Sequence, residues 1–251
     1  MMRLVAAEFT KVFSARLWLV LLLAAMGLTA LYVTLAIAFG DSPDNPSPPL
    51  SSPEGQATVL GTAGGASALT AVLGAIGLTG EFRHKTVTAA FLATPRRGRL
   101  VVAKLIAYGA LGVGYAVAAM IVVAAIAVPW LSAKGISMTA EGKGGLVAGV
   151  VVAISVFALI GVGLGALVRD QVATVVGLLV YLFVVEPIIT RIGALEAWSK
   201  YLPGAAEDAL TQISQSNQHL LAPWQGGLVL VAYGIVFAVA GTFVSMRRDV
   251  S

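Results

Sequence analysis

Residues 80–104 read GEFRHKTVTAAFLATPRRGRLVVAK and form the longest polar, positively charged interruption of an otherwise apolar chain. Glu81 is the single acid in this stretch, against six basic residues: Arg83, Lys85, Arg96, Arg97, Arg99 and Lys104. Apolar runs long enough to cross a bilayer lie on both sides of it. Because loops rich in Lys and Arg stay in the cytoplasm, we expect this loop to be cytoplasmic and to set the orientation of the whole protein.

Within the loop, residues 86–93 carry apolar side chains at helical spacing, with Phe91 the largest of them. Thr94-Pro95 ends the pattern, because the residue before a proline disfavours the α conformation. The pattern predicts a short amphipathic helix that lies across the cytoplasmic mouth. Two interpretations stay open here: a helix that a partner protein grips, or a solvated loop that binds lipid headgroups.

The run Glu81-Phe82-Arg83-His84, followed by Thr86 and then by Leu92-Ala93-Thr94-Pro95, resembles the loop after the second membrane helix of ABC-2 type permeases. These proteins are the membrane subunits of ABC exporters. Lys85 stands where many relatives carry Gly. The resemblance extends more loosely to the chain length, the number of helices and the run YLPGA at 201–205.

The resemblance implies that this loop holds a coupling helix that docks on a separate ATPase subunit. The residues that we expect to couple to the ATPase are Glu81, Phe82, Arg83, His84 and Phe91, together with Arg169 and Asp170 of the second internal turn. ATP and Mg would then be held by the partner ATPase, and this chain would carry no cofactor.

The composition indicates a membrane protein without reference to any family. The chain is 58% hydrophobic and 11% charged, whereas soluble domains are roughly 25% charged. Uncharged apolar runs of about 20 residues recur, as is typical of membrane helices. We therefore predict an all-α membrane protein with one transmembrane domain, residues 1–251, and six spans at about 17–39, 57–79, 105–128, 145–168, 172–190 and 226–245.

The segments outside and between the spans carry further signals. Residues 1–16 are amphipathic and predict an interfacial helix on the cytoplasmic leaflet; the alternative is a cleavable signal peptide. Residues 41–56 hold five prolines and predict an extended external loop. The second span is crowded with small residues, so we expect it to be buried among other helices, either by plain packing or because it lines a dimer interface or transport path. A short helix is expected over 205–213.

The distribution of charge predicts the topology. With six spans and a cytoplasmic N-terminus, twelve of the 16 Lys and Arg residues lie inside and four, namely Lys134, Lys143, Arg191 and Lys200, lie outside. This split follows the positive-inside rule. We expect a multi-pass protein of the plasma membrane with both termini in the cytoplasm.

The sequence lacks the residues that several kinds of chemistry require. No G-x-x-x-x-G-K-[ST] loop is present, so ATP cannot be bound by a phosphate loop. The two histidines, His84 and His219, are expected on opposite sides of the membrane, which argues against a histidine metal site or a Ser-His hydrolase. Cysteine is absent. We therefore expect a transport subunit that is no enzyme, binds no metal and binds no nucleic acid.

Three functions stay open. The first is the permease subunit of an ABC exporter that works by alternating access, as a homodimer or related heterodimer in membrane lipid, with two ATPase subunits. Its cargo would be a hydrophobic or amphipathic molecule such as a drug, an antibiotic, a lipid or a modified peptide. The second is an ion-coupled secondary transporter or channel, and the third is an intramembrane enzyme.

Glu186 is the single acid inside a predicted span, and Pro187 follows it. A charge at mid-depth costs on the order of 2.5 to 3.5 kcal/mol on insertion scales, so the carboxylate needs water, a partner or a proton. We predict a helix break at Pro187 and an external gate formed by Glu186 with Arg191. The alternative is that the helix ends early and leaves Glu186 among the outer headgroups.

Overall fold

The structure is a computed structural model, and it describes residues 1–42, 48–83, 97–139, 142–213 and 220–247. Within these ranges the chain is helical and contains no strand. Six helical segments are long and apolar enough to cross a membrane. The all-α class and the six predicted spans are therefore confirmed, and the protein is a multi-pass membrane protein.

The helices follow one another along the chain. Their bounds are α1 Met2–Ser14, α2 Leu17–Phe39, α3 Pro53–Gly61, η1 Thr62–Ala66, α4 Ser67–Arg83, α6 Arg97–Ala133, α7 Gly144–Val168, α8 Gln171–Val180, η2 Tyr181–Val185, α9 Glu186–Thr190, η3 Gly193–Leu195, α10 Glu196–Ser199, α11 Pro203–Thr211 and α12 Pro223–Arg247. The predicted coupling helix over 86–93 lies outside the described residues.

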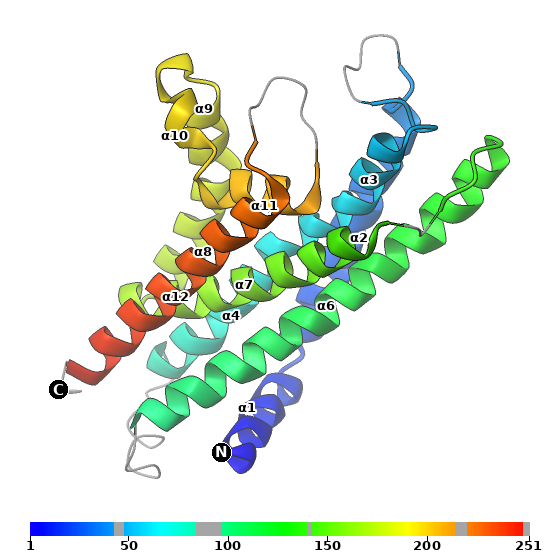
Figure 1. The fold of residues 1–251 in the computed structure, drawn as a ribbon. Coiled ribbons are helices and arrows are strands. Elements are labelled where there is room, and N and C mark those ends of the chain that lie inside the picture. The colour runs from blue at the N-terminus through cyan, green and yellow to red at the C-terminus, as the bar shows by residue number, and fades with distance from the viewer. Residues whose placement is uncertain (43–47, 84–96, 140–141, 214–219, 248–251) are drawn as a thin grey trace.

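The long helices run side by side, and their connections gather at two ends (Figure 1). One end holds α1, the end of α4, the start of α6, the turn between α7 and α8, and the end of α12; we call it the basic end. The other end holds α3, α9, α10 and α11, and we call it the opposite end. The N-terminus and the end of α12 both lie at the basic end, as an even number of spans requires.

The second span, which comprises α3, η1 and α4, forms the centre of the bundle. In its apolar window 83% of residues are buried, against 17% for the fifth span. α4 crosses α7 with the two backbones in contact: a Cβ at Gly161 would collide with the carbonyl of Ala71, and a Cβ at Gly74 with that of Ala158. The prediction that small residues bury this span is confirmed, and within the chain they serve helix packing.

Prolines shift several boundaries away from the predicted ones. Pro53 lies in the segment predicted to be extended, yet it begins α3, because a proline is tolerated in the first helical turn. Ser52 caps this helix by accepting a hydrogen bond from the Gly55 amide at 3.0 Å. Pro129, where the third span was expected to end, lies inside α6, which continues to Ala133.

The fifth span differs from the prediction at Pro187. The helix does not break there; it widens into a π-helical turn, η2, directly before α9 and then continues to Thr190. A π turn accommodates the loss of one backbone donor and the bulk of the proline ring without ending the helix. The short helix expected over 205–213 is present as α11, two residues earlier in the sequence.

Candidate functional site

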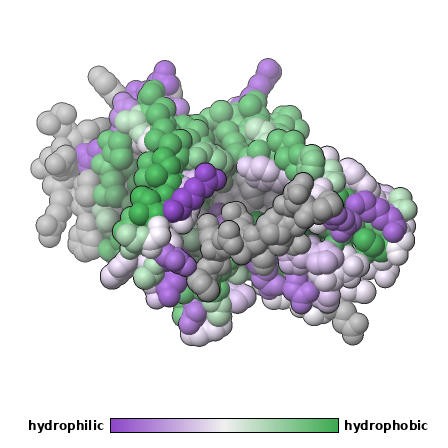
Figure 2. Space-filling view, turned by 90° about the horizontal axis from the view of Figure 1, so that it is seen from above, coloured by the Kyte–Doolittle hydropathy of each residue, from purple (hydrophilic) through white to green (hydrophobic). Residues whose placement is uncertain are grey.

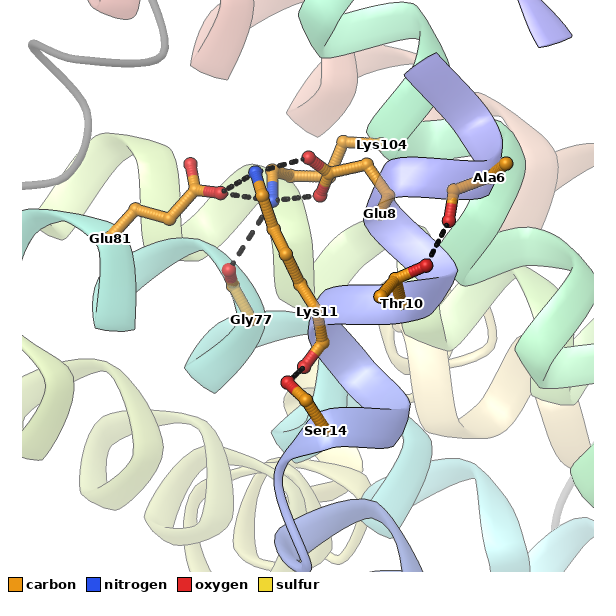
Figure 3. Close-up of polar contacts among 8 residues, drawn as sticks. All are labelled: Ala6, Glu8, Thr10, Lys11, Ser14, Gly77, Glu81 and Lys104. Atoms are coloured by element: carbon orange, nitrogen blue, oxygen red, sulfur yellow. Dashed lines mark hydrogen bonds and ion pairs between the residues drawn. The ribbon is translucent and has the colours of Figure 1, made fainter. Parts of the chain in front are cut away.

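Four charged side chains form a compact cluster at the basic end (Figure 3). The Lys104 ammonium lies 2.6 Å from Glu8 and 3.0 Å from Glu81, and the Lys11 ammonium lies 2.6 Å from Glu8 and 2.9 Å from Glu81. The Lys104 ammonium also donates a hydrogen bond to the Gly77 carbonyl at 3.4 Å. We call these four side chains the ion-pair cluster; it joins α1, α4 and α6.

Two members of this cluster are removed from solvent. Glu8 is 1% exposed and Lys104 is 3% exposed, so each needs its partner to offset the loss of hydration. Burial by itself raises the pKa of the Glu8 carboxyl, but Lys104 and Lys11 outweigh it and hold that pKa below its ordinary value. Burial by itself lowers the pKa of Lys11, but Glu8 and Glu81 outweigh burial and raise that pKa above its ordinary value. Both shifts favour the charged forms, the Glu8 carboxylate and the Lys11 ammonium.

A second set of contacts joins the end of α4 to the turn between α7 and α8. The Arg169 guanidinium lies over the Phe82 ring, 5.3 Å from its centroid, and Arg83 donates a hydrogen bond to the Gln171 side chain at 3.4 Å. Arg169 ends α7 with a left-handed backbone, φ 62°. Asp170 caps α8 by accepting a hydrogen bond from the Ala173 amide at 2.7 Å.

The structure thus brings together five of the seven residues expected to couple to an ATPase. Glu81, Phe82 and Arg83 of α4 lie beside Arg169 and Asp170, whereas His84 and Phe91 lie outside the described residues. Their coupling role stays a prediction. The sequence placed Lys104 and Glu81 in the same loop stretch, but it did not connect either of them to Glu8 or Lys11 of α1.

At the opposite end, Glu186 is buried with 4% of its surface exposed. Its Oε1 accepts a hydrogen bond from the Ala205 amide at 2.9 Å, at the N-terminus of α11. A Cβ at Gly204 would press against this carboxylate, so the glycine lets it approach closely. Glu186 therefore caps α11 from another helix, where a negative charge is stabilised. Between the described residues Glu186 and Arg191 the structure shows no ion pair.

Glu186 also lines a cleft of about 460 Å³. Its other acidic lining residues are Glu207 and Asp208 of α11, and Arg191 lies on the same cleft. We call it the acidic cleft. The hydropathy of the surface varies across the opposite end of the molecule (Figure 2). Hydrophobic residues cover one flank, and polar or near-neutral residues cover much of the rest.

The two carboxyls of α11, which lies between the fifth and sixth spans, both hold their protons more tightly than usual. Burial raises the pKa of Glu207 well above its ordinary value, and the nearby Ser67 hydroxyl, which falls short of hydrogen-bond geometry, offsets only part of this. Burial and the Glu186 charge raise the pKa of Asp208 to about 7. Sequence reasoning missed both residues, because adjacent acids in a polar segment are usually solvated.

No family model matches the chain, and no curated protein matches it either. The features that indicate a function are therefore the two ends of the bundle and the sequence motif at 81–95.

Proposed function

We propose that the chain is the membrane-spanning permease subunit of an ATP-driven exporter. It would work as a homodimer or related heterodimer with two copies of a separate ATPase subunit, which would hold ATP and Mg. The basic end would face the cytoplasm of a plasma membrane, and α1 would lie along the inner leaflet. The loop motif and the absence of a phosphate loop support this proposal.

The observation that carries the proposal is the way the base of the 84–96 loop is tied into the bundle. Glu81 lies three residues before the loop and Lys104 lies in α6 after it, and the two are joined at 3.0 Å. Glu8 links the same Lys104 to α1. A force applied to the loop by a partner would therefore reach α1, α4 and α6 together.

The second internal turn supports the same role. The Phe82–Arg169 and Arg83–Gln171 contacts place the α7–α8 turn against the end of α4. One partner surface could then contact both internal segments at once. Alternating access would follow if a pair of ATPase subunits closed on ATP and moved two such permeases. The apolar spans favour a hydrophobic or amphipathic cargo.

A direct test uses the chain purified from its native membrane in mild detergent. We expect an ATPase to co-purify and its hydrolysis rate to depend on the permease. Arg169→Glu at the basic end should lower both co-purification and permease-dependent hydrolysis, whereas Lys200→Glu, outside the acidic cleft at the opposite end, is the control charge reversal and should leave both unchanged. Folded Arg169→Glu protein that retains full ATPase association and stimulation would overturn the proposal.

One observation favours the ion-coupled transporter as a second candidate. Glu186, Glu207 and Asp208 line a single cleft, and carboxylates near membrane depth are common in proton-coupled carriers. Transport in proteoliposomes separates the two functions: the exporter needs ATP and its ATPase, whereas the ion-coupled carrier needs a proton gradient alone.

A further inference from the structure

The acidic cleft holds two carboxylate oxygens that lack hydrogen bonds. Oε2 of Glu186 and Oε1 of Glu207 are buried, and neither has a partner among the residues that the structure describes. Buried polar atoms in native proteins are almost always satisfied, and a buried charge is usually paired. The Ser67 hydroxyl lies near Glu207, so the oxygen that most clearly lacks a donor is Oε2 of Glu186, and a positively charged donor would suit it best.

We propose that the acidic cleft binds the ammonium or guanidinium group of an amphipathic organic cation through the carboxylates of Glu186, Glu207 and Asp208. This inference rests on the proposed function in that it names the chemical class of the cargo. The binding step itself requires neither an ATPase nor a second subunit.

The capping role of Glu186 accounts for one of its oxygens only. Oε1 accepts from the Ala205 amide, while Oε2 is left without a partner in the described chain. Arg191 lines the same cleft, but it is exposed at the end of α9 and makes no ion pair with Glu186. Burial raises the pKa of Glu207 well above its ordinary value, so the surplus of negative charge over Arg191 comes from Glu186 together with Asp208 once Asp208 is ionised.

The rest of the lining favours an amphipathic ligand over a metal ion. Tyr32 and Phe183 contribute aromatic rings, and Leu182 and Ile213 contribute aliphatic surface. Aromatic faces attract organic cations, and the cavity volume lies in the range of roughly 300 to 1,000 Å³ typical of small-molecule sites. Among the described residues, no group of three His, Asp or Glu side chains is arranged to hold a metal ion.

The acid–base properties of the cleft add a consequence. Asp208, with a pKa raised to about 7, shares the cleft with the charged groups Glu186 and Arg191, the carboxyl of Glu207, whose pKa is also raised, and the phenol of Tyr32. Protonation of Asp208 removes one negative charge. Binding of a cation should therefore be stronger at pH 8 than at pH 6.

The test uses dansylcadaverine, an amphipathic primary amine whose fluorescence rises on binding, with the purified full-length chain in detergent and empty micelles as the blank. Its N-acetyl derivative has nearly the same shape and no charge. A hydrogen bond to a charged group changes affinity by about tenfold or more. We therefore expect the amine to bind at least about tenfold more tightly than its N-acetyl derivative. Glu207→Gln and Asp208→Asn should each weaken binding by about tenfold.

Glu54→Gln is the matched control, because Glu54 is an exposed acid of α3 outside the cleft; binding should not change. Equal binding of the amine and its acetyl derivative by the wild-type chain would overturn the proposal, and this comparison needs no variant to fold. Unchanged affinity in both cleft variants would also overturn it. Because no ATPase is present, loss of the exporter proposal would leave this result standing, and the reverse holds as well.

Discussion

At the scale of single residues, the molecule depends on charges that are buried but paired. Lys104 is 3% exposed and touches Glu8 at 2.6 Å and Glu81 at 3.0 Å. Removing one member of a buried pair leaves an uncompensated charge and costs about 3–5 kcal/mol. An exposed ion pair contributes about 0–1 kcal/mol, because solvent screens it and its side chains lose freedom.

These values predict that Lys104→Met lowers the stability of the chain by at most about 3–5 kcal/mol, because Lys11 still pairs with Glu8 and Glu81. Lys134→Met is the matched control, since Lys134 forms a part-exposed pair with Asp41 at 3.4 Å and should cost about 1 kcal/mol or less. The midpoint of thermal unfolding, followed by tryptophan fluorescence in one detergent, measures both.

The double variant Glu8→Gln/Lys104→Met completes this prediction. It removes the buried charge together with its partner, so it should regain much of the loss seen in Lys104→Met. If Lys104→Met and Lys134→Met shifted the midpoint equally, the ion-pair cluster would not stabilise the fold.

This cluster also shows where sequence reasoning ends. Glu8 and Lys104 are 96 positions apart, and no local pattern in one sequence links positions so distant. Glu81, Phe82 and Arg83 could be selected from their loop motif, whereas Glu207 and Asp208 carry no motif and gain their significance from the cleft that surrounds them.

At the scale of elements, the spans could be predicted because hydrophobic length is a local property. The first span matches the prediction at both ends, Leu17–Phe39, and the fourth begins one residue earlier than expected. Two misplaced boundaries lie at Pro53 and Pro129, because the effect of a proline depends on its position in the helix. The third span also begins earlier than expected, at Arg97 and not near residue 105. In the sequence, the only sign of the crossing between α4 and α7 is the high number of glycines in these two helices.

That crossing predicts a steep response to one methyl group. Gly161→Ala would place its Cβ on the Ala71 carbonyl, and overpacking of this kind costs about 1–3 kcal/mol or more. Gly27→Ala in α2 is the matched control, because a Cβ there meets open space and should be neutral or slightly stabilising. The yield of monodisperse protein and its unfolding midpoint measure the difference.

If Gly161→Ala behaved like Gly27→Ala, the two backbones would not be in contact as the structure has them. The comparison is informative because both glycines lie inside helices, so their intrinsic helix propensities cancel.

At the scale of the whole molecule, every proposed role depends on which end faces the cytoplasm. The basic end holds α1, the end of α4 and the α7–α8 turn, whereas α9 and α11 lie at the opposite end (Figure 1). Residues of α9 and α11 line the acidic cleft. From the positive-inside rule we expect the basic end to face the cytoplasm. That orientation would put the ion-pair cluster within reach of an ATPase and would open the cleft toward the outside.

The absence of cysteine makes this orientation testable with single substitutions. Ser132→Cys, exposed at the opposite end of α6, and Ser14→Cys, exposed at the end of α1, form a matched serine pair. In intact cells an impermeant thiol reagent should label Ser132→Cys at once. It should label Ser14→Cys, and Thr94→Cys outside the described residues, only after the membrane is opened, because an apolar bilayer excludes a charged reagent. The reverse pattern would place the basic end outside, where no cytoplasmic ATPase could reach Glu81, Phe82 or Arg169, and the exporter proposal would fall.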